Sequence, residues 1–272
     1  MPEITVLMPV RNGGKYIKDA IDSVLQQSFE DFEFLIMDDG STDNTVDVIL
    51  SYSDSRIRLV KRRPDFVGSL NEGLSLARGI FIARMDADDI MHSERLRIQH
   101  KRMIRYPEIT LCSTWIKPFA DNDCPLPVNK QGDGFVKNPM LQMLQANIFA
   151  HPSIMMRKSF LQKHNLRYQE YPLAEDYKLW TEIAKAGGHF YIEPQFLLNY
   201  RVSSTQITAT KKEAMLEQTV IVKKEILDYL LRSRENNQIL LKLYEDMTTL
   251  EQEKLVHPND TFQLFWHILN KI

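Results

Sequence analysis

The sequence predicts an α/β fold, with a mostly parallel sheet flanked by helices and a helical C-terminal extension. Two observations support this prediction. Short apolar segments alternate with segments of helical periodicity through the first part of the chain, and residues from about 211 onward keep a helical pattern. The alternation indicates a parallel sheet, because a right-handed crossover joins successive parallel strands and leaves helices on both faces.

The alternation occurs four times. Four segments are short, apolar and rich in β-branched or aromatic residues, and we predict them to be strands: residues 3–10, 32–37, 56–61 and 80–85. Between them the apolar residues recur at helical spacing in residues 15–27, 46–50 and 70–77. From about residue 110 this rhythm weakens, and Pro, Asn and Gly concentrated between 118 and 139 predict a long loop over a site. A further helix is expected from Ala174 to Ala186, before two glycines.

Composition restricts the class of protein. With 272 residues, 43% of them hydrophobic, the chain can bury one large core. The formal net charge of −2 gives no field that would gather nucleic acid, so we expect no DNA or RNA partner. Cys112 and Cys124 are expected to be free thiols. We find no signal peptide and no apolar run long enough to span a bilayer, so a cytoplasmic location is expected.

Three polar clusters follow predicted strands: residues 11–14 (RNGG), 38–41 (DDGS) and 86–89 (DADD). Because the carboxyl ends of parallel strands meet at one edge of a sheet, we expect these clusters to converge there. In the first, Arg11 would contact a base or a phosphate, and the two glycines would let backbone N–H groups approach a ligand. Taken alone, that cluster indicates only a loop.

The segment Asp86-Ala87-Asp88-Asp89 is the strongest chemical signal. Three carboxylates within four residues repel each other unless a cation or solvent relieves the repulsion. Mg²⁺ or Mn²⁺ suits such a cluster, because these ions take one or two protein carboxylates together with phosphate and water. A solvated acidic turn is the better interpretation of an isolated motif of this length. Its position at the end of a strand favours the metal site.

Two further positions have competing interpretations. Asp39 would accept the imide N–H of uracil, although residues of a turn and a helix cap also fit this stretch. Glu175 and Asp176 open a predicted helix, where acidic residues favourably offset the helix dipole. Trp180 lies four residues after Asp176 and would offer an aromatic surface to a sugar, or else belong to the core. His151 precedes a proline and fits a hydrogen-bonded loop residue better than a catalytic one.

Six segments, in order from about residue 4 to 208, resemble the family 2 glycosyltransferases, which are inverting enzymes of the GT-A (Rossmann-like) fold. They are VLMPVRNGGKYI, DDGSTDNT at 38–45, GLSLARGIFIARMDADD at 73–89, residues 147–153, AEDYKLW at 174–180 and YRVSSTQIT at 200–208. The resemblance implies a nucleotide-sugar-binding half (1–110) and an acceptor-binding half of the same catalytic domain (111–210). The helical pattern of residues 211–272 predicts a C-terminal extension beyond them.

The resemblance also implies roles for residues. Asp176 would be the catalytic base that activates a hydroxyl of an oligosaccharide or lipid-linked glycan acceptor. The product would be β-linked, and transfer of N-acetylglucosamine or galactose is favoured. The other candidate site residues fall into three groups: donor-binding Pro9, Arg11, Asn12, Asp39, Asp86 and Ala87 for a UDP-sugar; acceptor-binding Glu175, Trp180 and His151; and Asp86 and Asp88 for Mn²⁺ or Mg²⁺.

Two departures from the family pattern matter. Ser203 stands where many relatives have a histidine, and the QxxRW signature of processive synthases is absent. Two other functions remain open: a sugar-phosphate nucleotidylyltransferase, and a nucleotide-sugar-binding module without catalysis. Beyond residue 211 a solvated helical face is the default. The alternatives are a homodimer contact or a peripheral contact with the inner face of the cell membrane, anchored by Phe262, Phe265 and Trp266.

Overall fold

The computed structural model describes residues 1–272 except 122–125, 129, 131, 204–209, 234–237 and 272. Its centre is one sheet with the strand order β3-β2-β1-β4-β8-β6-β9-β5, and β7 pairs with β9. The strands are β1 (Ile4–Val10), β2 (Phe32–Asp38), β3 (Ile57–Lys61), β4 (Phe81–Arg84), β5 (Ile90–Met91), β6 (Ile109–Phe119), β7 (Gly134–Phe135), β8 (Met155–Arg157) and β9 (His189–Arg201).

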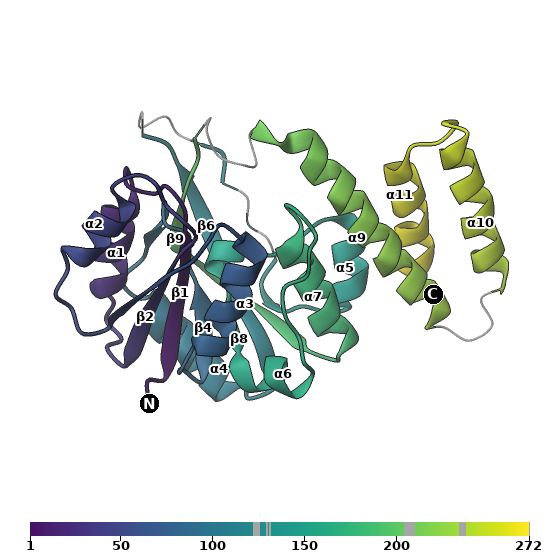
Figure 1. Cartoon of the computed structure of the whole chain (residues 1–272). Coiled ribbons are helices and arrows are strands. Elements are labelled where there is room, and N and C mark those ends of the chain that lie inside the picture. Colours follow the sequence, from purple (N-terminus) through teal and green to yellow (C-terminus); the bar gives the residue numbers. More distant parts are fainter. Residues whose placement is uncertain (122–125, 129, 131, 204–209, 234–237, 272) are drawn as a thin grey trace.

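Helices flank this sheet, and three more extend away from it (Figure 1). The helices beside the sheet are α1 (Ile17–Leu25), α2 (Thr45–Leu50), α3 (Phe66–Leu76), α4 (Arg95–Arg105), α5 (Pro139–Gln145), the 3₁₀ turn η1 (His151–Ser153), α6 (Lys158–Lys163) and α7 (Glu175–Lys185). The helices that extend away are α9 (Lys212–Arg232), α10 (Gln238–Gln252) and α11 (Pro258–Leu269). The predicted α/β class and the four-fold alternation of strand and helix are therefore confirmed.

Strand β1 shows why the first half folds as a parallel sheet. It pairs in parallel with β2 on one side and β4 on the other, and all seven of its residues are buried. Alternate side chains of a strand point to opposite faces, so Ile4, Val6 and Met8 pack with α1, whereas Leu7 packs with Leu70 of α3. Burial on both faces explains the continuous apolar run in this segment.

Helix α3 begins at Phe66, four residues before the predicted start at residue 70. The Asp65 side chain accepts a hydrogen bond from the Gly68 backbone N–H (2.8 Å) and so caps the helix. Periodicity misses this turn because Phe66 is 42% exposed and Gly68 has no side chain. The cap brings Phe66 and Asp65 to the edge of the sheet where the strands β1 and β4 end.

The second half of the sheet mixes directions. Strand β8 is antiparallel to β4 and to β6, while β6 and β9 form a long parallel pair. The loop expected over residues 118–139 is described in part, and within it β7 pairs with β9 and α5 begins at Pro139. Helix α7 agrees with the predicted helix at 174–186. Cys112 is buried and free, and Cys124 lies outside the described residues.

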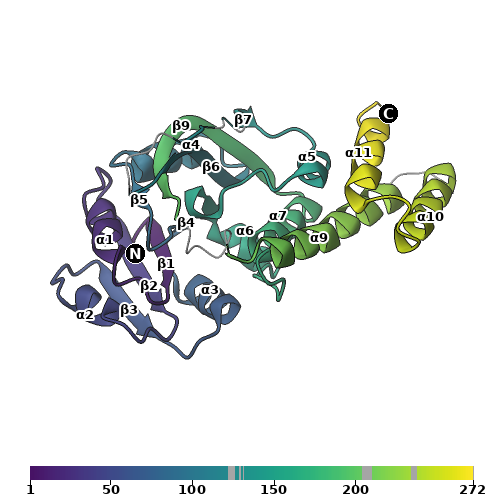
Figure 2. The ribbon, with the colours of Figure 1, turned by 90° about the horizontal axis from the view of Figure 1, so that it is seen from above.

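Helix α9 packs against α5 and α7, α11 packs against α5 and α9, and α10 packs against α11 (Figure 2). Phe262 and Phe265 are 2% and 0% exposed within this packing, so their expected role as membrane anchors is wrong. Amphipathic α11 turns them towards the core because α5 and α9 cover that face. Among the described residues, no helix is long and apolar enough to cross a bilayer. A membrane or dimer contact through other residues of 211–272 stays a prediction.

Candidate active site

The polar clusters that follow β1, β2 and β4 meet in one cavity of about 480 Å³, here named the strand-end cavity. Their convergence, expected from chain order, is therefore observed. All six residues implied for donor binding line this cavity. Its described lining is Pro9, Val10, Arg11, Asn12, Gly13, Tyr16, Asp39, Phe66, Asp86, Ala87, Asp88, Tyr200 and Ser203.

Asn12 holds the loop after β1 against the loop after β2. Its side-chain oxygen accepts a hydrogen bond from the Thr42 backbone N–H (2.8 Å), and its own N–H donates to the Ser41 hydroxyl (2.9 Å). Its φ of 53° lies in the left-handed region, which asparagine tolerates better than most residues. The two loops therefore form one wall of the strand-end cavity.

Gly14 has a different role from the expected one. Its backbone N–H donates to the Asp43 carboxylate (3.0 Å), so it is not offered to a ligand. A Cβ at this position would lie 1.9 Å from the Asn44 side-chain oxygen. The glycine is therefore required because one loop packs closely on another. From the sequence alone, this reason for a glycine cannot be distinguished from the close approach of a ligand.

Asp39 is 4% exposed and rigidly placed. One of its oxygens, Oδ1, accepts hydrogen bonds from the Asp65 backbone N–H (2.7 Å) and from the Ser69 hydroxyl (2.7 Å). Both donors belong to the start of α3, so Asp39 joins β2 to that helix. Two hydrogen bonds at one oxygen orient the carboxylate at the wall of the strand-end cavity.

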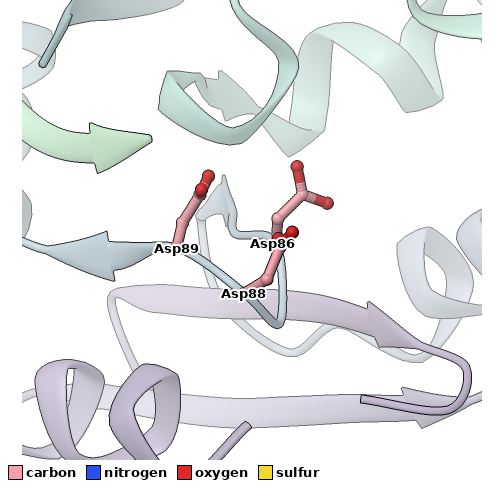
Figure 3. Close-up of side chains that lie close together, drawn as sticks. All are labelled: Asp86, Asp88 and Asp89. Carbon is pink, nitrogen blue, oxygen red and sulfur yellow. The ribbon is translucent and has the colours of Figure 1, made fainter. Parts of the chain in front are cut away.

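Asp86, Asp88 and Asp89 form an acidic cluster on the turn after β4. One ligand oxygen from each can be chosen so that all three lie within 4.8 Å of one another. Figure 3 shows the carboxylates projecting to the same side of the turn. Asp86 and Asp88 are partly exposed at the strand-end cavity, whereas Asp89 is fully buried and accepts a hydrogen bond from the Arg201 backbone N–H (2.8 Å).

This cluster fits a hard divalent cation. Burial and the neighbouring charges of Asp86 and Asp88 raise the pKa of Asp89 well above its usual value. Its Oδ2 is a buried oxygen without a hydrogen-bond partner among the described residues. A cation held by Asp86 and Asp88 would reduce the repulsion among the three carboxylates. Carboxylate oxygens are ligands that suit Mg²⁺ and Mn²⁺.

A second cavity of about 730 Å³, named the α7 cavity, adjoins the first. The two share Phe66, Asp86 and Tyr200 in their linings. The described residues of the α7 cavity are Asp65, Phe66, Val67, Arg84, Asp86, Ile116, Asn147, Phe149, Ala150, His151, Pro152, Glu170, Pro172, Leu173, Glu175, Asp176, Tyr200 and Met215. An acidic cluster and a separate carboxylate pair thus face adjoining spaces.

Asp176 lies at the first turn of α7, and two hydrogen bonds orient it. It accepts from the Asn147 side-chain amide (3.0 Å) and from the Tyr177 backbone N–H (2.6 Å). Burial raises the pKa of Asp176, while these hydrogen bonds and the charge of Arg84 act in the opposite direction. Burial and the charge of Asp176 raise the pKa of Glu175 to about 7. A carboxylate with a raised pKa is a better base for a hydroxyl proton.

His151 lines the α7 cavity but is mostly buried. Its Nε2 lies 2.8 Å from the Tyr168 hydroxyl oxygen, and burial and the charge of Arg84 lower its pKa well below the usual value. The imidazole is therefore neutral and shares a hydrogen bond with Tyr168. This geometry agrees with the expectation that His151 is a hydrogen-bonded residue.

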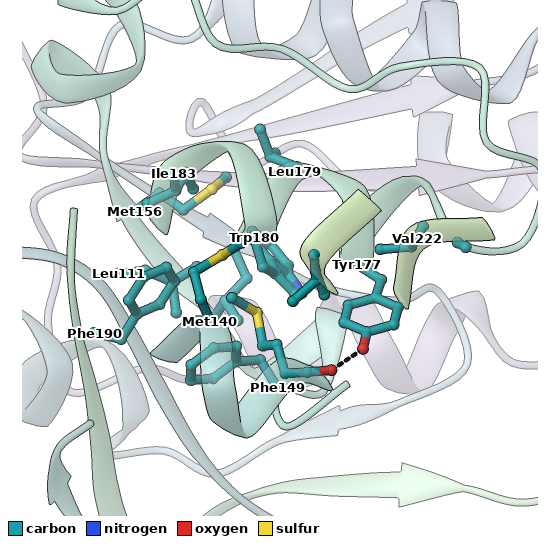
Figure 4. Packing of buried hydrophobic residues seen from close by; sticks show 14 of the residues in the cluster. Leu111, Met140, Phe149, Met156, Tyr177, Leu179, Trp180, Ile183, Phe190 and Val222 are labelled. Atoms are coloured by element: carbon teal, nitrogen blue, oxygen red, sulfur yellow. Dashed lines mark hydrogen bonds between the residues drawn. The ribbon is translucent and has the colours of Figure 1, made fainter. Parts of the chain in front are cut away.

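Trp180 is not available as a platform for a sugar. It is fully buried and lines neither cavity. Figure 4 shows its ring packed among apolar side chains such as Met140 and Phe149. Only the first turn of α7 reaches the cavity. One turn further, the same face of the helix lies beneath η1. There Trp180 packs edge-to-face on His151, with 5.7 Å between the ring centroids. The expectation that Trp180 binds the acceptor is therefore corrected.

We predict that Trp180→Ala lowers the free energy of unfolding by about 3–5 kcal/mol, because it removes a large buried ring and leaves a cavity. Chemical denaturation of the variant and the wild type measures this difference. A loss of stability below about 1 kcal/mol, combined with a higher KM for acceptor, would contradict this prediction and indicate that Trp180 binds the acceptor.

Phe66, Arg84 and Tyr200 are among the lining residues that sequence reasoning missed. Arg84 belongs to the buried strand β4, and a charged residue in an otherwise apolar strand is a signal that merits attention. Tyr200 stands beside Arg201 in the segment YRVSSTQIT. Phe66 carries no comparable signal, because its role depends on where α3 begins.

Comparison with known proteins agrees with this geometry. The model of glycosyl transferase family 2 matches residues 5–164. An uncharacterized glycosyltransferase of Haemophilus influenzae is 29% identical over 242 residues, which are 85% of this chain and 75% of the relative. The glucosyltransferase WfgD of Escherichia coli is 27% identical over 218 residues, 79% of this chain and 83% of its own.

Two solved structures have the same fold. Staphylococcus aureus TarS 1–349, in complex with UDP-GlcNAc, superposes with a TM-score of 0.69 at 18% identity over 84% of this chain and 66% of its own. The mannosyltransferase PcManGT from Pyrobaculum calidifontis, in complex with GDP-Man and Mn²⁺, has a TM-score of 0.58 at 16% identity over 98% and 85%. The chain therefore belongs to glycosyl transferase family 2 and has the GT-A fold.

Proposed function

We propose that this glycosyltransferase moves a sugar from a UDP-sugar to a hydroxyl of a glycan acceptor with inversion, forming a β-glycosidic bond. The observation that carries the proposal is that Asp86 lines both cavities, with the acidic cluster at one and Asp176 at the other. A leaving group and a nucleophile thus have separate, adjoining spaces. Galactose or N-acetylglucosamine is the favoured transferred sugar.

At the leaving-group end, Asp86 and Asp88 would hold Mn²⁺ or Mg²⁺. When bound there, such an ion stabilises the negative charge that develops on the β-phosphate of UDP. Pro9, Arg11, Asn12, Asp39 and Ala87 form the rest of the donor site, and the oriented carboxylate of Asp39 suits the uracil imide N–H. The Mn²⁺ in the PcManGT complex and the nucleotide in the TarS complex support this arrangement.

At the other end, Asp176 would take the proton from the attacking acceptor hydroxyl. The hydroxyl oxygen then forms a bond to the anomeric carbon on the side opposite the UDP, and the bond to UDP breaks. Glu175 and His151 line the same cavity and would bind the acceptor. Holding both substrates in adjoining cavities also lowers the entropic cost of the encounter.

The printed names of two relatives support the substrate class. WfgD is a UDP-Glc:α-D-GlcNAc-diphosphoundecaprenol β-1,3-glucosyltransferase, and one TarS structure contains UDP-GlcNAc. By analogy, the acceptor here would be an oligosaccharide or a lipid-linked glycan of a surface polysaccharide or lipooligosaccharide. The neutral His151 and the carboxyl groups of the α7 cavity suit the hydroxyls of a neutral sugar.

The test is a screen of UDP-sugars with Mn²⁺ against simple glycan acceptors, with UDP release as the readout. Acceptor-dependent release, with a β-linked product identified by NMR, supports the proposal. Release of pyrophosphate from a nucleoside triphosphate and a sugar phosphate would instead identify a nucleotidylyltransferase. Binding of UDP-sugar without hydrolysis or transfer would identify a binding module.

We predict that activity falls on acidification at a pH above the usual range for aspartate. The base must be ionised to act. Because burial raises the pKa of Asp176, this carboxylate becomes protonated, and therefore inactive, at a higher pH than an exposed aspartate. The dependence of kcat on pH with saturating substrates measures this limb. Full activity maintained down to the ordinary aspartate range, about pH 4, would contradict the assignment.

A further inference from the structure

The α7 cavity has an uneven charge. Five carboxyl groups line it, from Asp65, Asp86, Glu170, Glu175 and Asp176. Among the described residues of the lining, Arg84 is the one permanently charged cation, because His151 is neutral. The charge state of this cavity therefore depends on Arg84.

Arg84 is held firmly at the end of β4. It is 3% exposed, its backbone N–H donates to the Ile154 oxygen (3.0 Å), and its own backbone oxygen accepts from Arg95 Nη2 (2.9 Å). At the tip of the side chain, Nη2 lies 2.5 Å from Asp86 Oδ1. The guanidinium thus connects the buried strand to the acidic cluster.

The remaining donors of this guanidinium have no structural use. Nε and Nη1 are buried without a hydrogen-bond partner among the described residues. Burying an incompletely bonded cation is costly, and an apolar side chain of similar size would pack here without that cost. Stability of the fold therefore does not account for an arginine at this position.

We propose that Arg84 is a positioning residue of the transfer reaction: it holds Asp86 at the donor end of the site and stabilises the ionised carboxylate of Asp176 at the acceptor end. This inference rests on the proposed function. It assigns Arg84 no contact with either substrate, because Nε and Nη1 are buried and Nη2 is paired with Asp86.

The groups around Asp176 agree with this role. Arg84 opposes the rise that burial causes in the pKa of Asp176, and it acts in the same direction on Glu175. The other charged or titratable groups that line this cavity are Asp65 before α3, Asp86 after β4, His151 on η1, Glu170 before α7 and Tyr200 on β9. His151 is neutral and the acidic groups disfavour a further negative charge, so Arg84 supplies the opposing positive field.

The test compares Arg84→Gln, Arg84→Lys and a control, Arg102→Gln. Arg102 forms a part-buried ion pair with Glu193 (2.9 Å) and lines neither cavity. Carboxyl ¹³C NMR follows the titration of Asp176 in the protein without metal or substrate, so this readout does not depend on turnover. The acid limb of kcat against pH is the second readout.

We expect Arg84→Gln to move the titration of Asp176 and the acid limb of kcat upward by about one pH unit, because it removes an opposing charge. Arg84→Lys keeps the charge and should titrate like the wild type, while its KM for donor rises because Asp86 loses the guanidinium. Arg102→Gln should change neither readout.

An Asp176 titration unchanged in Arg84→Gln would overturn the inference while leaving the proposed function intact. If Arg84→Gln does not fold, Arg84→Lys is the deciding variant. It retains the positive charge, so an upward shift of its Asp176 titration by about one pH unit would overturn the inference. Absence of turnover in the wild type with every UDP-sugar would overturn the proposed function itself, whatever the NMR shows.

Discussion

Replacing Asp176 with asparagine is expected to lower kcat by about 10²–10⁴-fold, the range typical for loss of a general base. The amide has nearly the shape of the carboxylate but cannot take a proton from the acceptor hydroxyl. Because Asp176 lines the α7 cavity and not the strand-end cavity, the dissociation constant of UDP should stay within about two-fold of the wild type. Steady-state kinetics and calorimetric titration of UDP measure the two quantities.

Glu175→Gln is the matched control for this variant. Glu175 is the adjacent residue, lines the same cavity and also has a raised pKa, so the substitution removes a comparable charge. Its main effect should be a higher KM for acceptor. If Asp176→Asn retains wild-type turnover while Glu175→Gln abolishes it, Glu175 is the base and our assignment is wrong.

Replacing Asp88 with asparagine, or removing divalent ions with EDTA, is expected to reduce kcat/KM for the donor by at least about 10²-fold. The neutral amide is a weaker ligand for a hard cation, and without the cation the developing charge on the leaving diphosphate is unbalanced. The measurement is UDP release before and after chelation, followed by titration with Mn²⁺ or Mg²⁺.

Two controls make this result specific. After treatment with EDTA, added Mn²⁺ should restore the activity of the wild type. The activity of Asp88→Asn should recover only at a much higher concentration of Mn²⁺. Asp43→Asn removes an aspartate from the neighbouring loop that lines neither cavity, and its metal requirement should equal that of the wild type. Full activity in EDTA would show that the acidic cluster works without a metal.

The fold class could be predicted from the sequence because its signals are local. The continuous apolar run of β1 and the helical spacing in α1 each lie within a few residues, and the parallel crossover rule then orders the strands. The same rule placed Arg11, Asp39 and Asp86 at one edge of the sheet, where the structure has them. Helix α7 was also predictable, since its periodicity and terminal glycines are local.

The errors about aromatic residues share one cause. Trp180, Phe262 and Phe265 are aromatic residues on amphipathic helices, and periodicity identifies such a face without showing what covers it. For Trp180 the cover is η1 and α5, and for the two phenylalanines it is the packing of α5 and α9 on α11. Neither contact is visible in the spacing of residues along the chain.

The sequence by itself determined the α/β class, the order of the first strands and the meeting of three polar clusters at one edge. Only the tertiary structure decided that Asp86 lines two cavities, that Arg84 is the cation of the α7 cavity and that Asn147 orients Asp176. The physical reason is the range of the interactions. Periodicity and turn chemistry act between near neighbours in the chain, whereas burial and electrostatic fields depend on residues such as Arg84, Asn147 and Asp176, which are distant in sequence and adjacent in space.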